Sequence, residues 1–373
     1  MRELGLSWNF VSAWTQSEDQ DSSQDFRGWK SGVPRSHPID IKSRVIDIRK
    51  KLVEDADEYY TGDLAIQQAY GELYPSDPLP GIGYINDIIR DAGLVKVHRG
   101  KRRGVAVRYL CYPEHCIKQQ GTYIANVDFV GGKFIAGHQH PLHFLSIAYK
   151  EPRRLRCIQR TNGETTDEAI KITRETFDRL GWPDAVQTDA GNTFLGRSER
   201  RDGLGARSVS NYALFLLSNE VTPIFGAPRS PWNQGTVEGS NSVFGRNFWE
   251  RHTFTSIEMV DERIAAFNAS SKKYAQWKEP WTRETRGVSF IPRICFIRKV
   301  GEDTREKKGV ISVASESISF PQEYIGLFVF SEWYLKEQKL KIFFEREGVI
   351  QQIEEKPFSI HPRSQERCTQ FIA

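Results

Sequence analysis

The sequence predicts a multidomain α/β protein with a mixed-sheet core, an N-terminal helix-turn-helix-like helical domain and a C-terminal small β-barrel. Its 373 residues exceed the length of one average domain, so several compact units are expected. From about residue 120, short β-rich runs alternate with amphipathic segments, as in sheets that carry helices on both faces. From 309 to 360, short β-rich runs follow one another, which suggests the barrel.

Residues 1–15 look like the second half of a helix-turn-helix. Gly5 suits the tight turn, and the Ser7 hydroxyl suits the cap of the next helix. The helix that should come first is missing, so either the motif is a coincidence or the open reading frame begins inside it. We favour the second interpretation, a partial helix-turn-helix remnant left by a truncation or a misplaced start. Residues 16–39 are polar and contain two prolines, and we interpret them as a linker.

Residues 40–95 predict three short helices. Each has an apolar stripe at helical spacing, formed by Ile41, Val45, Ile48 and Leu52, by Leu64, Ile66, Ala69, Tyr70 and Leu73, and by Tyr84, Ile85, Ile88 and Ile89. Prolines and glycines precede the third helix, and this pattern fits a helix-turn-helix-like DNA-binding domain. A helical bundle without a role in DNA binding is the alternative.

A basic segment at 96–118 joins this unit to the core. No acidic residue occurs between Leu94 and Tyr112. The candidates for contact with DNA phosphates are Arg99, Lys101, Arg102 and Arg103. Such a run is either a solvated loop or a linker that follows the phosphate backbone.

Three carboxylates in residues 119–285 stand where a mixed sheet can bring them together. Asp128 lies within a β-rich run, and Asp189 ends a later strand, where open α/β sheets place ligand sites. Glu238 falls in the first turn of a helix that follows a proline-rich segment. An unpaired carboxylate is costly to bury, so packing alone does not account for these residues.

Clustered carboxylates repel one another unless cations neutralise them. Oxygen ligands select hard ions, so we expect Mg²⁺ or Mn²⁺, and two ions. A pair of ions about 3.5–4 Å apart activates an attacking hydroxyl and stabilises the leaving oxygen of a phosphodiester displacement. We therefore assign Asp128, Asp189 and Glu238 as both catalytic and metal-binding residues. The chain has no Gly-rich loop that would cradle nucleotide phosphates, so nucleotide hydrolysis is not supported.

The ordered motifs resemble the catalytic core of bacterial insertion-sequence transposases, the retroviral-integrase-type DDE group. The matching segments are Val127-Asp128-Phe129, the Thr-Asp-x-Gly motif within 187–194, and Pro-x-x-Pro-x-x-x-Gly-x-x-Glu at 228–238. The resemblance covers about 40–360. It implies a ribonuclease-H-like core, metal-dependent cleavage at element ends and transfer of the 3′-hydroxyl into target DNA. It also implies double-stranded DNA as the partner and a homo-oligomer on paired ends.

Several features depart from that family. Ala190 follows the second Asp, where the family most often has Asn, and Gly239 follows the Glu, where it usually has Arg. The second Asp and the Glu are separated by 48 residues, more than is typical. The segment 196–208 is a natural insert, and its candidates for DNA phosphate contacts include Arg197, Arg200 and Arg201. These departures bear on DNA contacts and efficiency more than on the reaction class.

Two other functions stay open. The first is a ribonuclease-H-like nuclease that cleaves without joining, and the second is a catalytically silent, transposase-derived DNA-binding protein. Zinc sites are weaker alternatives. His138, His140 and His143 have no nearby Cys or acid to complete four ligands, and Cys111, His115 and Cys116 lack zinc-finger spacing.

The composition predicts where in the cell the protein acts, and the patterns along the chain predict the order of its domains. The five cysteines are scattered, and the sequence has no signal segment and no apolar run long enough to cross a membrane. We therefore expect a cytoplasmic, nucleoid-associated prokaryotic protein with no membrane partner. The expected plan is a remnant (1–15), a linker (16–39), the helical domain (40–95), a basic linker (96–118), the catalytic core with trailing helices (119–285), a linker (286–308), the barrel (309–360) and a tail (361–373).

Overall fold

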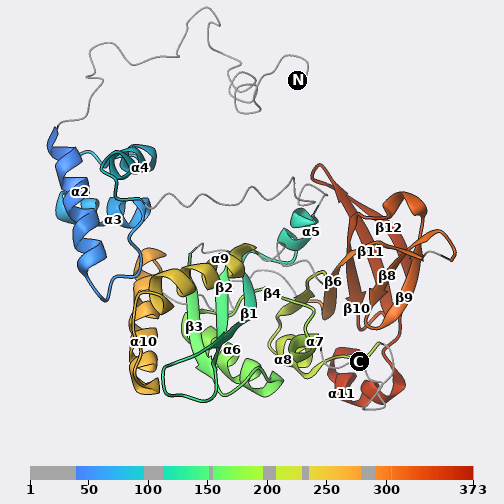
Figure 1. Ribbon diagram of the computed structural model, residues 1–373. Coiled ribbons are helices and arrows are strands. Elements are labelled where there is room, and N and C mark those ends of the chain that lie inside the picture. The colour runs from blue at the N-terminus through green and yellow to red at the C-terminus, as the bar shows by residue number, and fades with distance from the viewer. Residues whose placement is uncertain are drawn as a thin grey trace, which may run out of the picture.

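The computed structural model describes residues 39–95, 112–150, 154–195, 207–228, 235–278, 290–303 and 305–372 (Figure 1). The predicted N-terminal remnant and most of the linker after it lie outside these residues. So do all seven arginines and lysines assigned to DNA phosphates: Arg99, Lys101, Arg102, Arg103, Arg197, Arg200 and Arg201. Those assignments stay predictions.

Three helices form in the N-terminal region, where the sequence predicts them. They are α2 (Ile39–Glu54), α3 (Asp63–Leu73) and α4 (Ile82–Asp91). Their apolar stripes face one another in a small core that contains Val45, Ile66 and Ile85. Leu73 is an exception, because it is exposed rather than packed in that core. Pro75 follows the end of α3, and a proline disfavours helical backbone in the residue before it. That this unit binds DNA stays a prediction.

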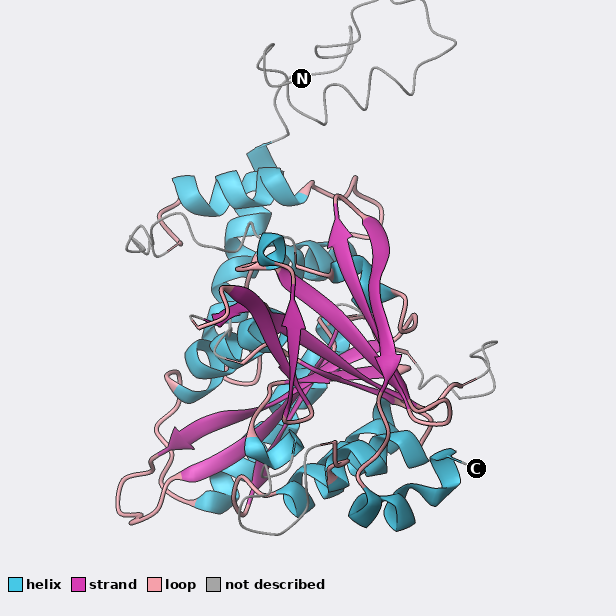
Figure 2. Ribbon diagram, turned by 90° about the vertical axis from the view of Figure 1, so that its right-hand side faces the viewer, coloured by secondary structure: helices cyan, strands magenta, loops and turns pink. Residues whose placement is uncertain are grey.

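A nine-stranded mixed sheet forms the centre of the molecule, with strand order β12-β11-β10-β6-β5-β4-β1-β2-β3. Strands β1 (Ile124–Lys133), β2 (Leu142–Tyr149) and β3 (Arg156–Thr161) are antiparallel neighbours. Strands β4 (Ala185–Thr188) and β5 (Thr222–Phe225) continue from β1 in parallel. This mixed sheet is consistent with the predicted core. Figure 2 shows the twist that accumulates across its strands.

Helices cover both faces of the sheet, because each strand there alternates apolar side chains between two cores. One face packs against α6 (Thr166–Leu180), α8 (Asn211–Ser218) and the short α7 (Asn192–Leu195). The other packs against a continuous helical segment and a long helix: α9 (Gly235–Val243), the π-helix η4 (Phe244–Trp249) and α10 (Ile257–Tyr274). Within the described ranges, no helix combines the length and apolar composition that a membrane crossing requires.

Contacts with α10 and η4 hold the helical unit against the core, near the β3 edge of the sheet. Tyr60 stacks on Tyr274 with ring centroids 4.3 Å apart. The Asn247 amide donates to the carbonyl of Tyr59 at 2.8 Å. The Arg251 guanidinium donates to three backbone carbonyls, one in the last turn of α2 (Val53) and two in the loop after it (Asp55 and Glu58). The end of α2 and the loop between α2 and α3 therefore hold this unit against η4 and α10.

The expectation of a separate C-terminal barrel is not confirmed. Four C-terminal strands extend the central sheet beyond β5: β6 (Arg293–Lys299), β10 (Phe328–Tyr334), β11 (Lys339–Arg346) and β12 (Val349–Pro357). Residues 293–299 were expected in a linker, but β6 pairs in parallel with β5. Without β6, the edge of β5 would leave backbone donors and acceptors unpaired. The sheet therefore continues instead of ending at β5.

The remaining C-terminal elements pack on the same core. A three-stranded sheet is formed by β7 (Gly301–Asp303), β8 (Lys308–Val313) and β9 (Glu316–Phe320). Short helices complete the described chain: α5 (Glu114–Lys118), which contacts β11, the 3-10 turn η6 (Gln322–Tyr324), and α11 (Pro362–Ile372) in the predicted tail. Ile311 of β8 and Phe371 of α11 belong to the core cluster that also includes Val127 and Val186.

Candidate active site

Asp128 lies in β1 and points to the sheet face that α9 covers. In this strand Ala125 and Val127 belong to the opposite core with α6 and α8, so the alternation of side chains puts Asp128 on the α9 face. Asp128 pairs with Ser146 of β2. Its carboxylate is half-buried, and its Oδ2 accepts a hydrogen bond from Nδ2 of Asn241 in α9 at 3.1 Å.

Asp189 follows the last residue of β4, next to Asp128. The parallel register pairs Asn126 with Gln187 and Val127 with Thr188, and its continuation by one residue sets Asp128 opposite Asp189. Both carboxylates therefore leave neighbouring strands on the same face of the sheet, and neighbouring strands are about 4.8 Å apart.

The Thr-Asp-x-Gly motif has a local physical basis. The backbone N–H of Gly191 donates to Oδ1 of Asp189 at 2.9 Å, which orients the carboxylate. A Cβ atom at position 191 would lie 2.9 Å from Oδ1 and 3.0 Å from Oδ2 of the same carboxylate. Only glycine leaves that carboxylate in place.

Glu238 reaches the site through α9, which packs on β1 and β2. The Oγ atoms of Ser240 and Ser146 are 3.3 Å apart, and Asn241 binds Asp128, so this helix is fixed over the strand that carries Asp128. Glu238 and Asn241 are three residues apart and share one face of the helix. Nothing lies within 4 Å of a Cβ at Gly239, so packing does not require glycine there.

The electrostatics of the site oppose negative charge. The pKa of Asp128 is raised to about 7, mainly by burial and then by the charges of Asp189 and Glu238, while the hydrogen bond from Asn241 opposes the rise. Desolvation also raises the pKa of Asp189, with a further contribution from Glu164 and an opposing one from the Gly191 N–H. Because these neighbouring acids resist losing their protons together, the site favours the binding of a positive charge.

The donor chemistry of these side chains fits a hard divalent cation, since all three are carboxylates and the site favours positive charge. In the part of the chain that the structure describes, no group of three or more His, Cys, Asp or Glu side chains is arranged to hold a metal ion. Metal binding by Asp128, Asp189 and Glu238 therefore stays a prediction.

The histidine-based alternatives gain no support within the described ranges. His138 and His140 are exposed in the turn between β1 and β2, and Nδ1 of His143 lies 3.0 Å from Oε1 of Glu164. His115 contacts the nearly buried carboxylate of Glu345 in β11, with Nδ1 2.7 Å from Oε1. Cys116 is buried, and Cys111 lies outside the described residues.

Two residues near the carboxylates, Asn241 and Glu164, were not predicted from the sequence. Asn241 contacts Asp128, and its position one helical turn after Glu238 is the only signal that pointed to it. Glu164 lies in the loop between β3 and α6 and acts on Asp189 through its charge. No spacing rule links a residue of that loop to the end of β4, because only the sheet brings the two together.

Comparison with known proteins gives structural neighbours only. No protein-family profile matches the chain, and no curated protein matches it. Similar solved structures are retroviral integrases. The HTLV-2 integrase catalytic core domain in complex with magnesium (trimeric form) is 15% identical, covers 41% of this chain and 84% of its own, and has a TM-score of 0.29. The BIV integrase catalytic core domain is 12% identical, with coverages of 41% and 83% and a TM-score of 0.27.

A larger assembly is also similar to part of the chain. It is the simian T-cell lymphotropic virus intasome in complex with PP2A regulatory subunit B56 gamma, at 12% identity and a TM-score of 0.34. The alignment covers 56% of this chain and 78% of the matching chain in that assembly. No residue role is transferred from these structures to this chain.

Proposed function

We propose that this chain is a DDE-type transposase or integrase, a polynucleotidyl transferase that cleaves DNA at element ends and joins the 3′-hydroxyl to target DNA. One observation carries the proposal: Asp128 and Asp189 leave adjacent parallel strands on one face, under the helix that carries Glu238. Packing gains nothing from two adjacent acids that resist ionisation, so their juxtaposition favours a role in metal-dependent chemistry.

Asp128, Asp189 and Glu238 would hold Mg²⁺ or Mn²⁺. When bound, two such ions supply activation of the attacking hydroxyl and stabilisation of the leaving oxygen. The protein's own groups orient the ligands. The Asn241 amide holds Oδ2 of Asp128, and the Gly191 N–H holds Oδ1 of Asp189, which leaves the other carboxylate oxygens available. Asn241 and Gly191 are therefore positioning residues in this proposal.

Double-stranded DNA is the proposed substrate, as element ends and as target. The helical unit at 40–95 and the basic residues of 96–118 and 196–208 are proposed to contact it, and assembly as a homo-oligomer on paired ends is part of the same proposal. The helical unit docks directly on η4 and α10, which follow α9 in the chain. DNA held by that unit would therefore lie near the helix that carries Glu238.

A joining assay tests the proposal. Inverted repeats in the DNA that flanks the gene define candidate end oligonucleotides, and the purified full chain is incubated with them in Mg²⁺ or Mn²⁺. We expect cleavage and strand transfer. Asp189→Asn is expected to abolish both while leaving DNA binding intact, and the exposed Asp167→Asn in α6 is the matched control. Cleavage that persists in Asp189→Asn would overturn the mechanism, and cleavage without joining would favour the nuclease.

A catalytically silent DNA-binding protein is the second candidate. It is favoured by the lack of a metal-holding group among the described side chains and by Ala190 and Gly239, which depart from the family pattern. This candidate predicts binding of the end oligonucleotides with no cleavage in either metal. Restoring Asn at 190 and Arg at 239 in that case distinguishes a decayed enzyme, which regains cleavage, from a dedicated binding protein.

A further inference from the structure

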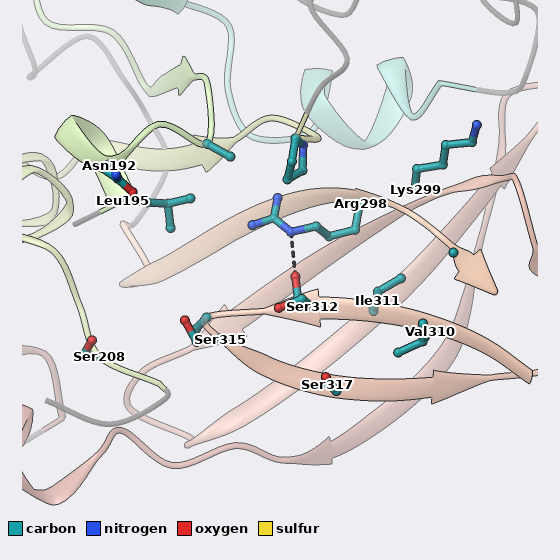
Figure 3. A pocket seen from close by; sticks show the side chains of 14 residues that line it. Asn192, Leu195, Ser208, Arg298, Lys299, Val310, Ile311, Ser312, Ser315 and Ser317 are labelled. Atoms are coloured by element: carbon teal, nitrogen blue, oxygen red, sulfur yellow. Dashed lines mark hydrogen bonds between the residues drawn. The ribbon is translucent and has the colours of Figure 1, made fainter. Parts of the chain in front are cut away.

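A cavity of about 550 Å³ opens beside the candidate active site (Figure 3). One wall comes from the segment directly after Asp189, through Ala190, Asn192 and Leu195. The opposite wall is the three-stranded sheet β7-β8-β9. The volume lies within the range of ligand-binding pockets and exceeds the space that a single small ion needs.

Arg298 of β6 lines this cavity although only 6% of the residue is exposed. Its Nε donates to the Ser312 carbonyl at 2.7 Å. Its Nη1 donates to the carbonyls of Ile297, Gly226 and Phe225 at 2.8, 2.9 and 3.3 Å. Nη2 makes no hydrogen bond with any described residue. Figure 3 shows the guanidinium group pointing toward the segment that carries Asn192 and Leu195.

The charge of Arg298 is not compensated within the described part of the chain. Its partners are neutral groups: backbone carbonyls and the Phe296 ring, whose centroid lies 5.0 Å from Cζ. No carboxylate there forms an ion pair with it. Burial lowers the pKa of Arg298 to about 10, which reflects the cost of holding this cation away from water. A buried cation without a counter-ion is costly, and an anion that enters the cavity would offset that cost.

The rest of the lining suits a phosphate group. Lys299 also lines the cavity, although its amine extends away from the Arg298 guanidinium (Figure 3), and the described lining residues include no Asp or Glu. Four serines contribute hydroxyl groups that can donate to phosphate oxygens: Ser208, Ser312, Ser315 and Ser317. A lining that has cationic and hydroxyl groups but no carboxylate is typical of a phosphate site and not of a metal site.

We propose that this cavity binds a backbone phosphate of the DNA strand that enters the active site, with Arg298 as its cation, while Lys299 would contact a neighbouring phosphate of the same strand. The proposal rests on the proposed function, because it takes the ligand to be the same DNA. Ala190 and Asn192 directly follow the carboxylate of Asp189 in the chain, so a strand held in the cavity runs on toward that carboxylate. The cavity would fix the register of the strand relative to the reacting phosphodiester.

Ser317 is the best position for a test. It is exposed in β9, opposite Ser312, and it lies outside the carboxylate site. Ser315 is unsuitable, because it has a positive φ of 63° in the β8–β9 turn, where a larger side chain would be strained. Arg298 is unsuitable, because its guanidinium holds four backbone carbonyls and its loss would disturb the fold.

The test compares Ser317→Glu with Ser317→Gln, which have the same shape and differ by one negative charge. Fluorescence anisotropy measures binding of a labelled DNA duplex to the full chain in EDTA, so that no cleavage is required. We expect Ser317→Glu to bind the duplex about tenfold more weakly than Ser317→Gln, because both variants lack the hydroxyl and only the Glu carboxylate repels the phosphate. Lys299→Gln is expected to reduce the slope of log K against log salt by about one, while Lys308→Gln at the far end of β8 leaves it unchanged.

The outcomes distinguish a DNA phosphate from a free phosphate as the ligand. They also distinguish failure of the phosphate site from failure of the proposed enzyme activity. Equal binding by Ser317→Glu and Ser317→Gln would overturn the DNA-phosphate site. If inorganic phosphate stabilises wild type and Ser317→Gln against heat but not Ser317→Glu, while DNA binding is equal, the cavity takes a free phosphate and the proposal fails. If the anisotropy differences appear but no metal-dependent cleavage is found, the result supports the phosphate site and contradicts the proposed enzyme activity.

Discussion

Replacing Asp128 with Asn should stabilise the metal-free protein at high pH. The folded-state pKa of Asp128 is about 7, against an ordinary value of 3.8, mainly because of burial and then because of Asp189. Between these two values the folded chain keeps a proton that the unfolded chain has lost. Stability of the wild type therefore falls as the pH rises through this window, and the loss is complete above about pH 7.

The size of the effect follows from the same pKa values. A difference of roughly three units corresponds to an upper bound of about 4 kcal/mol at 1.36 kcal/mol per unit. Because Asp128 is only half-buried and water can relax around its carboxylate, we expect about 1–2 kcal/mol. The Asn side chain keeps the shape and an oxygen that accepts the hydrogen bond from Asn241, so the variant loses the charge and little else.

Urea unfolding in EDTA, measured from pH 5 to pH 8.5, tests this expectation. The advantage of Asp128→Asn over wild type should grow steadily with pH and level off above about pH 7. The control is Asp47→Asn, on the exposed face of α2, which should change stability little at any pH. An Asp128→Asn variant that is no more stable than wild type at pH 8.5 would refute the crowded, desolvated site described above. So would an advantage that does not depend on pH.

Two further predictions concern the geometry of the site and the docking of the helical unit. Gly191→Ala puts a Cβ 2.9 Å from Oδ1 of Asp189 and should displace that carboxylate. We therefore expect metal-dependent cleavage to fall by at least about tenfold while the circular dichroism spectrum stays unchanged. Wild-type activity in this variant would contradict the proposed role of the carboxylate. Arg251→Ala removes three hydrogen bonds to the end of α2 and the loop after it, so limited proteolysis within 55–62 should accelerate. Arg246→Ala loses only a bond within its own helical segment and should digest like wild type.

Local patterns in the sequence were sufficient for much of the fold. Apolar stripes at helical spacing located α2, α3 and α4, because a surface helix must bury one face whatever its neighbours are. The β-rich run around Asp128 and the short run before Asp189 became adjacent parallel strands. The Thr-Asp-x-Gly motif was also readable, and its glycine is explained by the space that the Asp189 carboxylate occupies.

The C-terminal region shows where such patterns stop being sufficient. A period of two identifies a strand but does not say which sheet the strand joins. The runs after residue 309 were therefore compatible with a barrel, and β6 was concealed in an expected linker. In the structure, β6 pairs with both β5 and β10 and so makes one sheet from two predicted units. That partnership depends on backbone edges that no sequence window contains.

By itself, the sequence determined the three carboxylates, their order and the elements that carry them. Only the tertiary structure decided that Asp128 and Asp189 share one face and that Asn241 holds Asp128. It also decided that Arg298 is buried beside the Asp189 loop with no charged partner among the described residues. The physical reason is that side-chain type and periodicity are local, whereas charge compensation and desolvation depend on residues far apart in the chain. Asp128 and Asn241 are 113 positions apart, and their contact exists only because α9 packs on the sheet.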